Sequence, residues 1–232
     1  RPDHFGGIAI NRLFDSETPI WALFGKLADI AILSLLWTIC SLPVITIGAS
    51  SAALARTTLN MNTGEGNWRA RHFFQYFRRN LRNATPLWLI YLVIAALLTM
   101  NLMILKGAEG TIVTMQRFAS VLGLILWVFT AVWVFPLTSQ FDSKLIQTIR
   151  NAFYLGVSWL PRTILMSLLW ILPVGLAVFF PDIFARIVVL WPVLFFGGTA
   201  YLCAKLMLRP LTPYFEESGI RIGNEPDEPD EL

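Results

Sequence analysis

The chain has little charge and few of the residue types that catalysis and metal binding use. Charged residues make up 14% of its 232 residues, whereas hydrophobic residues make up 56%. It contains two histidines and two cysteines, and no spacing typical of zinc or haem ligands is present. A soluble domain of this length needs no such excess of apolar residues to fill its core. The composition therefore predicts an integral membrane protein.

Several catalytic motifs are also missing. The sequence has no phosphate-binding Gly-Lys loop, which excludes an ATPase, and no Gly-x-Ser-x-Gly or His-Glu-x-x-His motif, which argues against a hydrolase. Cys40 and Cys203 lie in apolar runs, where we expect small packing residues rather than a disulfide. No general acid and base share a plausible site. We expect no enzymatic activity, no catalytic residue, no cofactor and no metal.

Long apolar runs are what the sequence does contain. Four of them cover residues 86–105, 119–134, 163–180 and 187–207. Each run, in some cases with its flanking residues, is about long enough to cross roughly 30 Å of hydrocarbon as a helix. Within the last run, Gly197-Gly198 suits a close helix contact, a bend or a substrate-binding break. The predicted fold is all-α, a polytopic bundle of transmembrane helices.

The first apolar region leaves the number of spans open at five or six. Residues 21–40 read as a span, residues 41–51 interrupt it, and residues 52–61 resume as a short, more polar helix. This second piece either completes a hairpin through the membrane, which gives six spans and a cytoplasmic N-terminus, or lies at the cytoplasmic interface, which gives five spans and an outer N-terminus. The small residues Gly48, Ala49, Ala52 and Ala53 favour the hairpin.

Arginines set the expected orientation. Six of them lie between the first apolar region and the run at 86–105 against one acid, Glu65, and such an excess marks a cytoplasmic segment; they are Arg56, Arg69, Arg71, Arg78, Arg79 and Arg82. Lys205 and Arg209 close the last run on the same side. We expect residues 1–217 to form one membrane domain with a cytoplasmic C-terminus. Residues 218–232 are acidic and rich in proline, which predicts a disordered tail.

Two amphipathic helices are expected at the cytoplasmic interface. In residues 68–84 the apolar residues recur at helical spacing on one face; they are Ala70, Phe73, Phe74, Phe77, Leu81 and Ala84. This face would meet either the acyl boundary or the bundle. Arg71, Arg78, Arg79 and Arg82 lie opposite and would bind anionic lipid head groups or a protein partner. The adjoining span leaves little room for nucleic acid, which we do not expect. Residues 143–158 form the second helix.

A cluster around the break in the first apolar region is the main site prediction; it comprises Asp29, Pro43, Thr46, Gly48 and Arg56. Asp29 lies inside an apolar run, where a carboxylate needs a partner or a proton. Lys26 is one turn away. If a hairpin turns at Pro43, however, Asp29 comes within a turn of Arg56. We therefore predict a buried Asp29–Arg56 ion pair that brackets the break at residues 46–49.

The same region resembles a known family. Residues 33–54, LSLLWTICSLPVITIGASSAAL, resemble the signature of the YesL-like bacterial membrane proteins, a family of unknown function, and further matches lie at residues 73–85, 135–136 and 159–163. The resemblance implies a multi-pass protein of the bacterial cytoplasmic (inner) membrane. Such proteins are often encoded beside carbohydrate importers of the ATP-binding cassette type. The family supplies no catalytic residues.

Two function classes remain. The chain is either a non-enzymatic accessory or interaction subunit linked to carbohydrate uptake, or a small transporter or channel in its own right. A transporter needs polar groups near the bilayer midplane, and the four runs carry few; they are Thr99, Asn101, Thr130, Ser167 and Thr199. This favours the accessory subunit. The expected partners are the lipid bilayer and its anionic head groups, with a permease subunit or a second copy of the chain as protein candidates.

Overall fold

The computed structural model describes residues 19–63, 70–141, 145–187 and 191–218, and within these residues the chain is helical with no strand. The helices are α2 (Pro19–Cys40), α3 (Ile47–Thr63), α4 (Ala70–Ile104), α5 (Thr111–Gln140), α6 (Leu145–Ser158), α7 (Leu160–Phe179), α8 (Pro181–Ile187) and α9 (Phe196–Ser218), with a 3-10 turn, η1 (Val44–Thr46), and a π-helix, η2 (Trp191–Phe195). The predicted all-α class is confirmed. The acidic tail at 219–232 lies outside the described residues.

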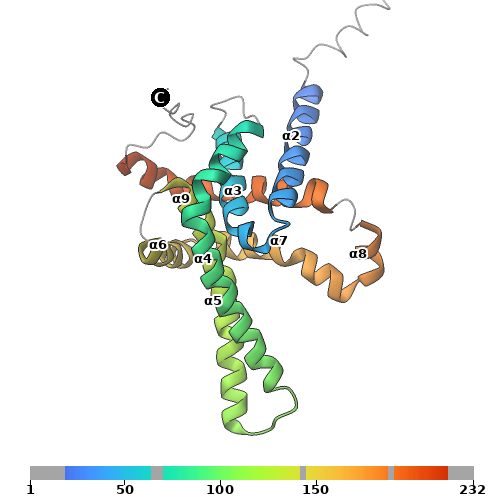
Figure 1. Ribbon diagram of the computed structural model, residues 1–232, viewed down its shortest axis with the longest axis vertical. Helices are drawn as coiled ribbons and strands as arrows, with labels where there is room; N and C mark the ends of the chain where they lie inside the picture. Colours follow the sequence, from blue (N-terminus) through green and yellow to red (C-terminus); the bar gives the residue numbers. More distant parts are fainter. Residues whose placement is uncertain (1–18, 64–69, 142–144, 188–190, 219–232) are drawn as a thin grey trace, which may run out of the picture.

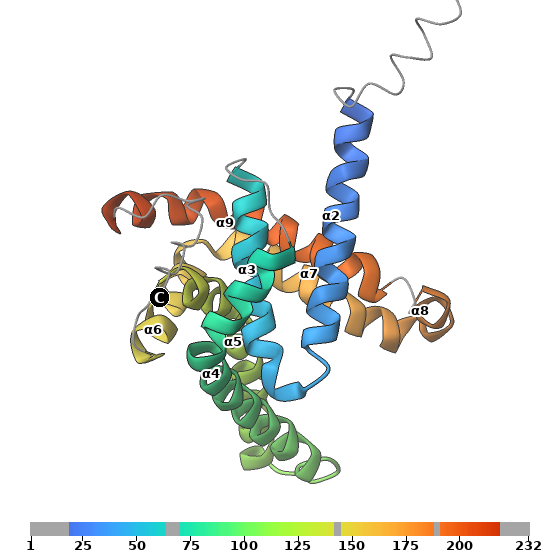
Figure 2. The ribbon, with the colours of Figure 1, turned by 45° about the horizontal axis from the view of Figure 1, so that its top comes forward.

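The helices do not form a simple parallel bundle. Helices α4 and α5 make a long hairpin that extends away from the rest of the molecule, while α7 and α9 run across its inner end (Figures 1 and 2). Helices α2 and α3 rise on the side opposite the hairpin tip. Helix α3 is central, because it packs against α4, α5 and α9.

Among the described residues, three helices, α4, α5 and α7, are long and apolar enough to cross a membrane. A fourth span is present if α8 and the segment 192–212, which are bent by 70° relative to each other, count as one. Within the described residues the chain therefore has the helices of a membrane protein. The larger count of five or six spans stays a prediction.

Helix α4 joins two segments that the sequence suggests as separate elements. The expected interfacial helix at 68–84 and the apolar run at 86–105 form one 35-residue helix with Pro86 in its interior. A proline removes one backbone hydrogen bond and favours a kink. Burial holds the helix on both sides of Pro86, because Tyr76 and Ala84 before it and Leu87 after it are buried.

The aromatic face of α4 packs on the protein. Phe73 is 0% exposed and Tyr76 is 2% exposed. Both belong to a buried cluster that includes Leu33 of α2, Leu54 of α3 and Ala200 of α9. This face was expected to meet either the acyl boundary of the membrane or the helix bundle. In the structure, Phe73 and Tyr76 pack against the bundle.

Helices α2 and α3 are joined by a compact turn. The Thr46 hydroxyl donates to the carbonyl oxygens of Cys40, at 2.6 Å, and Pro43, at 2.7 Å. The hydroxyl oxygens of Ser41 and Ser50 lie 2.6 Å apart across the turn. The last carbonyl groups of a helix have no partner within that helix. The Thr46 hydroxyl supplies a donor to one of them, that of Cys40, and so stabilises the turn. The two helices form a hairpin, and its passage through a membrane stays a prediction.

Small residues allow α3 to approach its neighbours closely, as expected. Ala49 and Ala52 are fully buried. A Cβ atom at Gly48 would lie 2.5 Å from Trp88 Cβ and 2.6 Å from the Ala84 carbonyl oxygen. The backbones of α3 and α4 therefore touch at Gly48.

The last apolar run is interrupted. The π-helix η2 precedes α9, and α9 then meets α2 at Gly197. The Gly197 N–H donates to Ser34 Oγ at 2.5 Å, and a Cβ atom at this position would collide with the Ile30 carbonyl oxygen. Of the expected roles of Gly197-Gly198, a close helix contact is the one that the structure shows.

Helix α6 nearly coincides with the second amphipathic helix expected at 143–158. It covers Leu145–Ser158. Thr148, Ala152 and Leu155 are buried against the rest of the molecule, whereas Ile146 is 82% exposed. Its position at a membrane interface stays a prediction.

Candidate functional site

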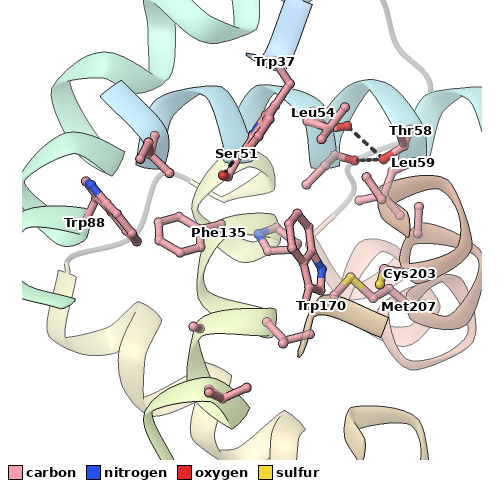
Figure 3. A pocket seen from close by; sticks show the side chains of 18 of the residues that line it. Trp37, Ser51, Leu54, Thr58, Leu59, Trp88, Phe135, Trp170, Cys203 and Met207 are labelled. Atoms are coloured by element: carbon pink, nitrogen blue, oxygen red, sulfur yellow. Dashed lines mark hydrogen bonds between the residues drawn. The ribbon is translucent and has the colours of Figure 1, made fainter. Parts of the chain in front are cut away.

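A cavity of about 430 Å³ lies between α2, α3, α4, α5, α7 and α9 (Figure 3). Its volume falls within the roughly 300–1,000 Å³ typical of small-molecule sites. Five large aromatic residues line it, namely Trp37, Trp88, Trp127, Phe135 and Trp170, and none of the charged residues that the structure describes does. We call it the aromatic cavity.

Two of the tryptophans are fixed by the α2–α3 hairpin. The Trp37 indole N–H donates to Ser51 Oγ at 3.2 Å, which links α2 to α3. The Trp88 indole N–H donates to the Val44 carbonyl oxygen at 2.7 Å, which ties α4 to the turn. Because each indole directs its single donor into the protein, the ring presents only apolar surface to the cavity.

A third tryptophan is fixed in the same way. The Trp127 indole N–H donates to the Tyr91 carbonyl oxygen at 2.8 Å, across the α4–α5 pair. The Trp170 ring packs near the Phe196 ring, with the ring centroids 6.4 Å apart. The indole donors of Trp37, Trp88 and Trp127 are therefore engaged within the protein.

The hydroxyl groups on the α3 wall are engaged as well. Thr58 Oγ1 donates to the Leu54 carbonyl oxygen at 2.8 Å, and Ser51 Oγ accepts the Trp37 donor. A buried polar group that already has its partner gains little from a ligand. The cavity is thus suited to an apolar group.

The residues that line the aromatic cavity range from buried to exposed. Leu59 is 0%, Met207 2% and Cys203 5% exposed, and we call the part of the wall that they form the buried end. Ile171 and Val174 of α7 are 44% and 63% exposed, and we call their part the open end. An apolar ligand could therefore enter beside α7.

The structure brings three predicted site residues together at the α2–α3 turn. Pro43 and Thr46 form the turn itself, and Gly48 follows it at the contact with Trp88. Their observed role is structural, because they shape the turn and allow the close approach of α4. They do not line the aromatic cavity.

Arg56 lies further along α3 and reaches two other helices. One terminal N–H donates to the Ser139 carbonyl oxygen near the end of α5, where helix carbonyls lack partners in the same helix. The guanidinium carbon also lies 4.8 Å from the centre of the Tyr76 ring of α4, a cation–π distance. Asp29 is half-buried on α2, and its pairing with Arg56 stays a prediction.

The four arginines of α4 are exposed. Arg71, Arg78, Arg79 and Arg82 lie away from the buried face that carries Phe73. This arrangement matches an amphipathic segment with its basic side outward. Their contact with lipid or a partner stays a prediction.

Sequence reasoning missed the tryptophans. The sequence contains nine, and tryptophans of membrane proteins gather at both interfaces. Trp127 and Trp170, however, lie near the middle of the runs at 119–134 and 163–180, where an interfacial position does not explain them. That placement is the signal that could have indicated an aromatic site.

Comparison with known proteins identifies one family. Residues 30–102 match the model of a family described as a protein of unknown function, DUF624. The match covers the second half of α2, all of α3 and nearly all of α4, which is less than half of the chain. No curated protein and no solved structure matches. In the described residues, no group of three or more His, Cys, Asp or Glu could hold a metal ion. Residues 30–102 therefore carry a DUF624 domain, which supports the expected uncharacterised family, and the YesL-like name stays a prediction.

Proposed function

We propose that the chain is a non-enzymatic accessory or interaction subunit of the bacterial cytoplasmic membrane, linked to carbohydrate importers of the ATP-binding cassette type. The apolar outer surface of the α4–α5 hairpin is the observation that supports this most. Leu97 is 62%, Met103 75% and Phe118 70% exposed. In an apolar stretch of 18 residues, only 11% of α4 and 22% of α5 are buried within the protein. This surface is available to lipid and to helices of a partner.

Two polar side chains in the apolar part of the hairpin have hydrogen-bond partners inside it. Thr99 Oγ1 donates to the carbonyl oxygen of Ala95, one turn earlier, at 2.8 Å. Asn101 Nδ2 donates to Ser120 Oγ at 3.0 Å, which links the two helices. Hydrogen bonds of this kind hold membrane helices together. They leave few polar groups to line a path for a sugar, which supports an accessory role over transport by the hairpin.

The link to carbohydrate uptake rests on the family resemblance, and a cellular experiment tests it. Deleting the gene should lower the uptake of a labelled sugar through the neighbouring importer, and expression of the intact chain should restore it. A photo-crosslinking amino acid at Leu97 should capture the importer's permease subunit. The control is Leu105, which is 9% exposed and should capture nothing. Unchanged uptake together with no cross-link at Leu97 would contradict the proposal.

A transporter or channel is the second candidate, and one residue favours it. The Ser167 hydroxyl of α7 is buried, and no partner for it is found in the part of the chain that the structure describes. A buried hydroxyl without a partner is unusual and could contact a passing solute. Uptake of a labelled sugar into liposomes that contain only this chain, lost in Ser167→Ala, would favour transport. An accessory subunit gives no uptake in this assay.

A further inference from the structure

We propose that the aromatic cavity holds a hydrocarbon chain of a membrane lipid, which enters from the bilayer beside α7. The inference goes beyond the accessory function and does not depend on it, because a lipid could occupy the cavity in a transporter or in an interaction subunit alike. It rests on the chemistry of the cavity wall, on the exposure at its two ends and on its size.

The wall selects an apolar occupant. The indole donors of Trp37, Trp88 and Trp127 already bind acceptors of the protein. In the described part of the chain, no charged residue lines the cavity. The hydroxyl groups of a sugar would lose their water here and find few partners, and buried polar groups without partners are costly. A hydrocarbon chain has no hydrogen bonds to water to lose, so it enters the cavity without this cost.

The position of the open end selects a lipid as the source. Ile171 and Val174 lie on α7, one of the three helices apolar enough to cross a membrane. Both are exposed on the outside of the described structure. The cavity is therefore continuous with a surface that would face hydrocarbon, so an acyl chain could enter sideways without passing through water.

The size of the cavity excludes a helix of a partner. A helix with its side chains is about 10–12 Å across, whereas the space has a volume of about 430 Å³ and ends at the buried residues Leu59 and Met207. A single flexible chain fits such a space. Its methylene groups would restore dispersion contacts that an empty apolar void lacks.

The test uses a phospholipid with a photoreactive diazirine at the end of one acyl chain. The full-length protein is reconstituted into nanodiscs that contain this lipid, irradiated and digested. We expect labels on residues 54–59 of α3 and 203–207 of α9, which contribute the buried end of the cavity. Met103, which is 75% exposed, should be labelled by surrounding lipid and serves as an internal control.

Two cavity-filling variants make the test specific. Ala131→Phe on α5 and Ala55→Leu on α3 enlarge lining residues from different walls, and each should lower the labelling of residues 54–59 and 203–207 at least several-fold. Ala119→Phe enlarges an exposed residue of α5 outside the cavity and should leave that labelling unchanged. Labelling at Met103 should persist in all three variants.

Other results would overturn the proposal. Labelling confined to Met103 in the wild-type protein would show that the chain end does not reach the cavity. Equal labelling of residues 54–59 in the wild type and in whichever filled variant folds, judged by a single symmetric elution peak, would also contradict it. So would calorimetric binding of a disaccharide that Ala131→Phe or Ala55→Leu abolishes, because the occupant would then be polar.

Discussion

At the scale of single residues, Gly48 holds α3 and α4 together by having no side chain. We expect Gly48→Ala to lower the free energy of unfolding by about 1–3 kcal/mol, the usual cost of overpacking. The added Cβ atom would lie 2.5 Å from Trp88 Cβ and 2.6 Å from a backbone oxygen, and the helices would have to separate. Thermal unfolding of the purified protein measures the effect.

Gly175→Ala is the matched control for Gly48→Ala. It also lies inside a helix, α7, and a Cβ atom there meets nothing within 4 Å. Alanine favours helix over glycine by up to about 1 kcal/mol, so the control should be neutral or slightly stabilising. Equal melting temperatures for the two variants would argue against the close α3–α4 contact.

Thr163 is a second residue whose loss should be costly. Its hydroxyl accepts the Trp133 indole N–H at 2.9 Å and donates to the Gly156 carbonyl oxygen at 3.0 Å, which connects α5, α6 and α7. Thr163 and Trp133 are both 0% exposed. We expect Thr163→Val to lower the free energy of unfolding by about 1–3 kcal/mol, because a buried donor and a buried acceptor lose their partner.

The conservative variant separates the hydrogen bond from packing. Thr163→Ser retains the hydroxyl and removes only a methyl group, so it should lose less stability than Thr163→Val. Both are measured by thermal unfolding in the same detergent. If Thr163→Ser proves the more damaging, packing rather than the Trp133 hydrogen bond decides the stability of this contact.

The sequence predicts some residue roles and not others. Small residues around Gly48 indicated a close helix contact, which is found. The interruption expected at 41–51 is shorter than predicted, because α3 already begins at Ile47. The partner of that contact could not be predicted, since Ala84 and Trp88 lie far along the chain. The contacts of Arg56 with Ser139 and Tyr76 were not predicted, because a counting argument along one hairpin does not include the helices that pack beside it. The pairing of Arg56 with Asp29 stays a prediction.

At the scale of elements, α4 combines a basic segment with an apolar one. Replacing Arg71, Arg78, Arg79 and Arg82 together by glutamine should lower the binding of the purified protein to liposomes with anionic lipid, since each arginine near such a surface contributes about 1 kcal/mol. All four are exposed, so the fold should persist. Flotation with anionic and with neutral liposomes measures the difference.

The glutamine variant also tests whether these arginines bind a protein partner instead of lipid. Its control is a variant with the four arginines replaced by lysines, which keeps the positive charge and should keep lipid binding. If the glutamine variant floats as the wild type does but loses its cross-link to a permease, the arginines recognise protein instead. An effect on neither would leave them as signals of orientation.

Element positions were largely predictable, and their continuity was not. Runs at 86–105, 119–134 and 163–180 lie within or nearly within α4, α5 and α7, because length and apolar character decide which segments suit a membrane. Pro86 suggested a boundary, but α4 continues through it. Buried side chains on both sides of Pro86 outweigh the loss of one hydrogen bond, and this tertiary effect is not visible in local sequence.

At the scale of the whole molecule, the expected orientation can be tested with introduced cysteines. In a background with Cys40→Ser and Cys203→Ala, cysteines at Gln75 and Glu228 should both resist an impermeant thiol reagent in intact cells, because the arginine excess marks the cytoplasmic side. Both should react after the cells are opened. Glu228 lies outside the described residues, so labelling is the direct measurement.

A cysteine at Ala108 supplies the opposite result. This residue lies in the short connection between α4 and α5 and is exposed. It should react in intact cells if the hairpin tip is outside. Reaction at Gln75 together with protection at Ala108 would reverse the orientation.

The aromatic cavity was the least predictable feature of the molecule. Its wall draws on six helices, and no stretch of sequence holds more than part of it. The apolar surroundings of Trp127 and Trp170 in the sequence indicate a nonpolar environment, but not whether that environment is lipid, protein core or a cavity. In the structure, the crossing of α7 and α9 over the inner end of the hairpin places both side chains at a cavity.

The central position of α3 has a consequence for biogenesis. This helix is rich in hydroxyl and amide side chains, and Thr57, Thr58 and Leu59 are almost fully buried. Part of its covering comes from α9, since Leu59 shares a cluster with Cys203 and Met207 and Asn62 donates to the Tyr201 carbonyl oxygen. Helix α9 leaves the ribosome after every other described helix. Before α9 has been synthesised, the surface of α3 that α9 covers remains exposed in the newly made chain. Packing around α3 is therefore completed only after the synthesis of α9.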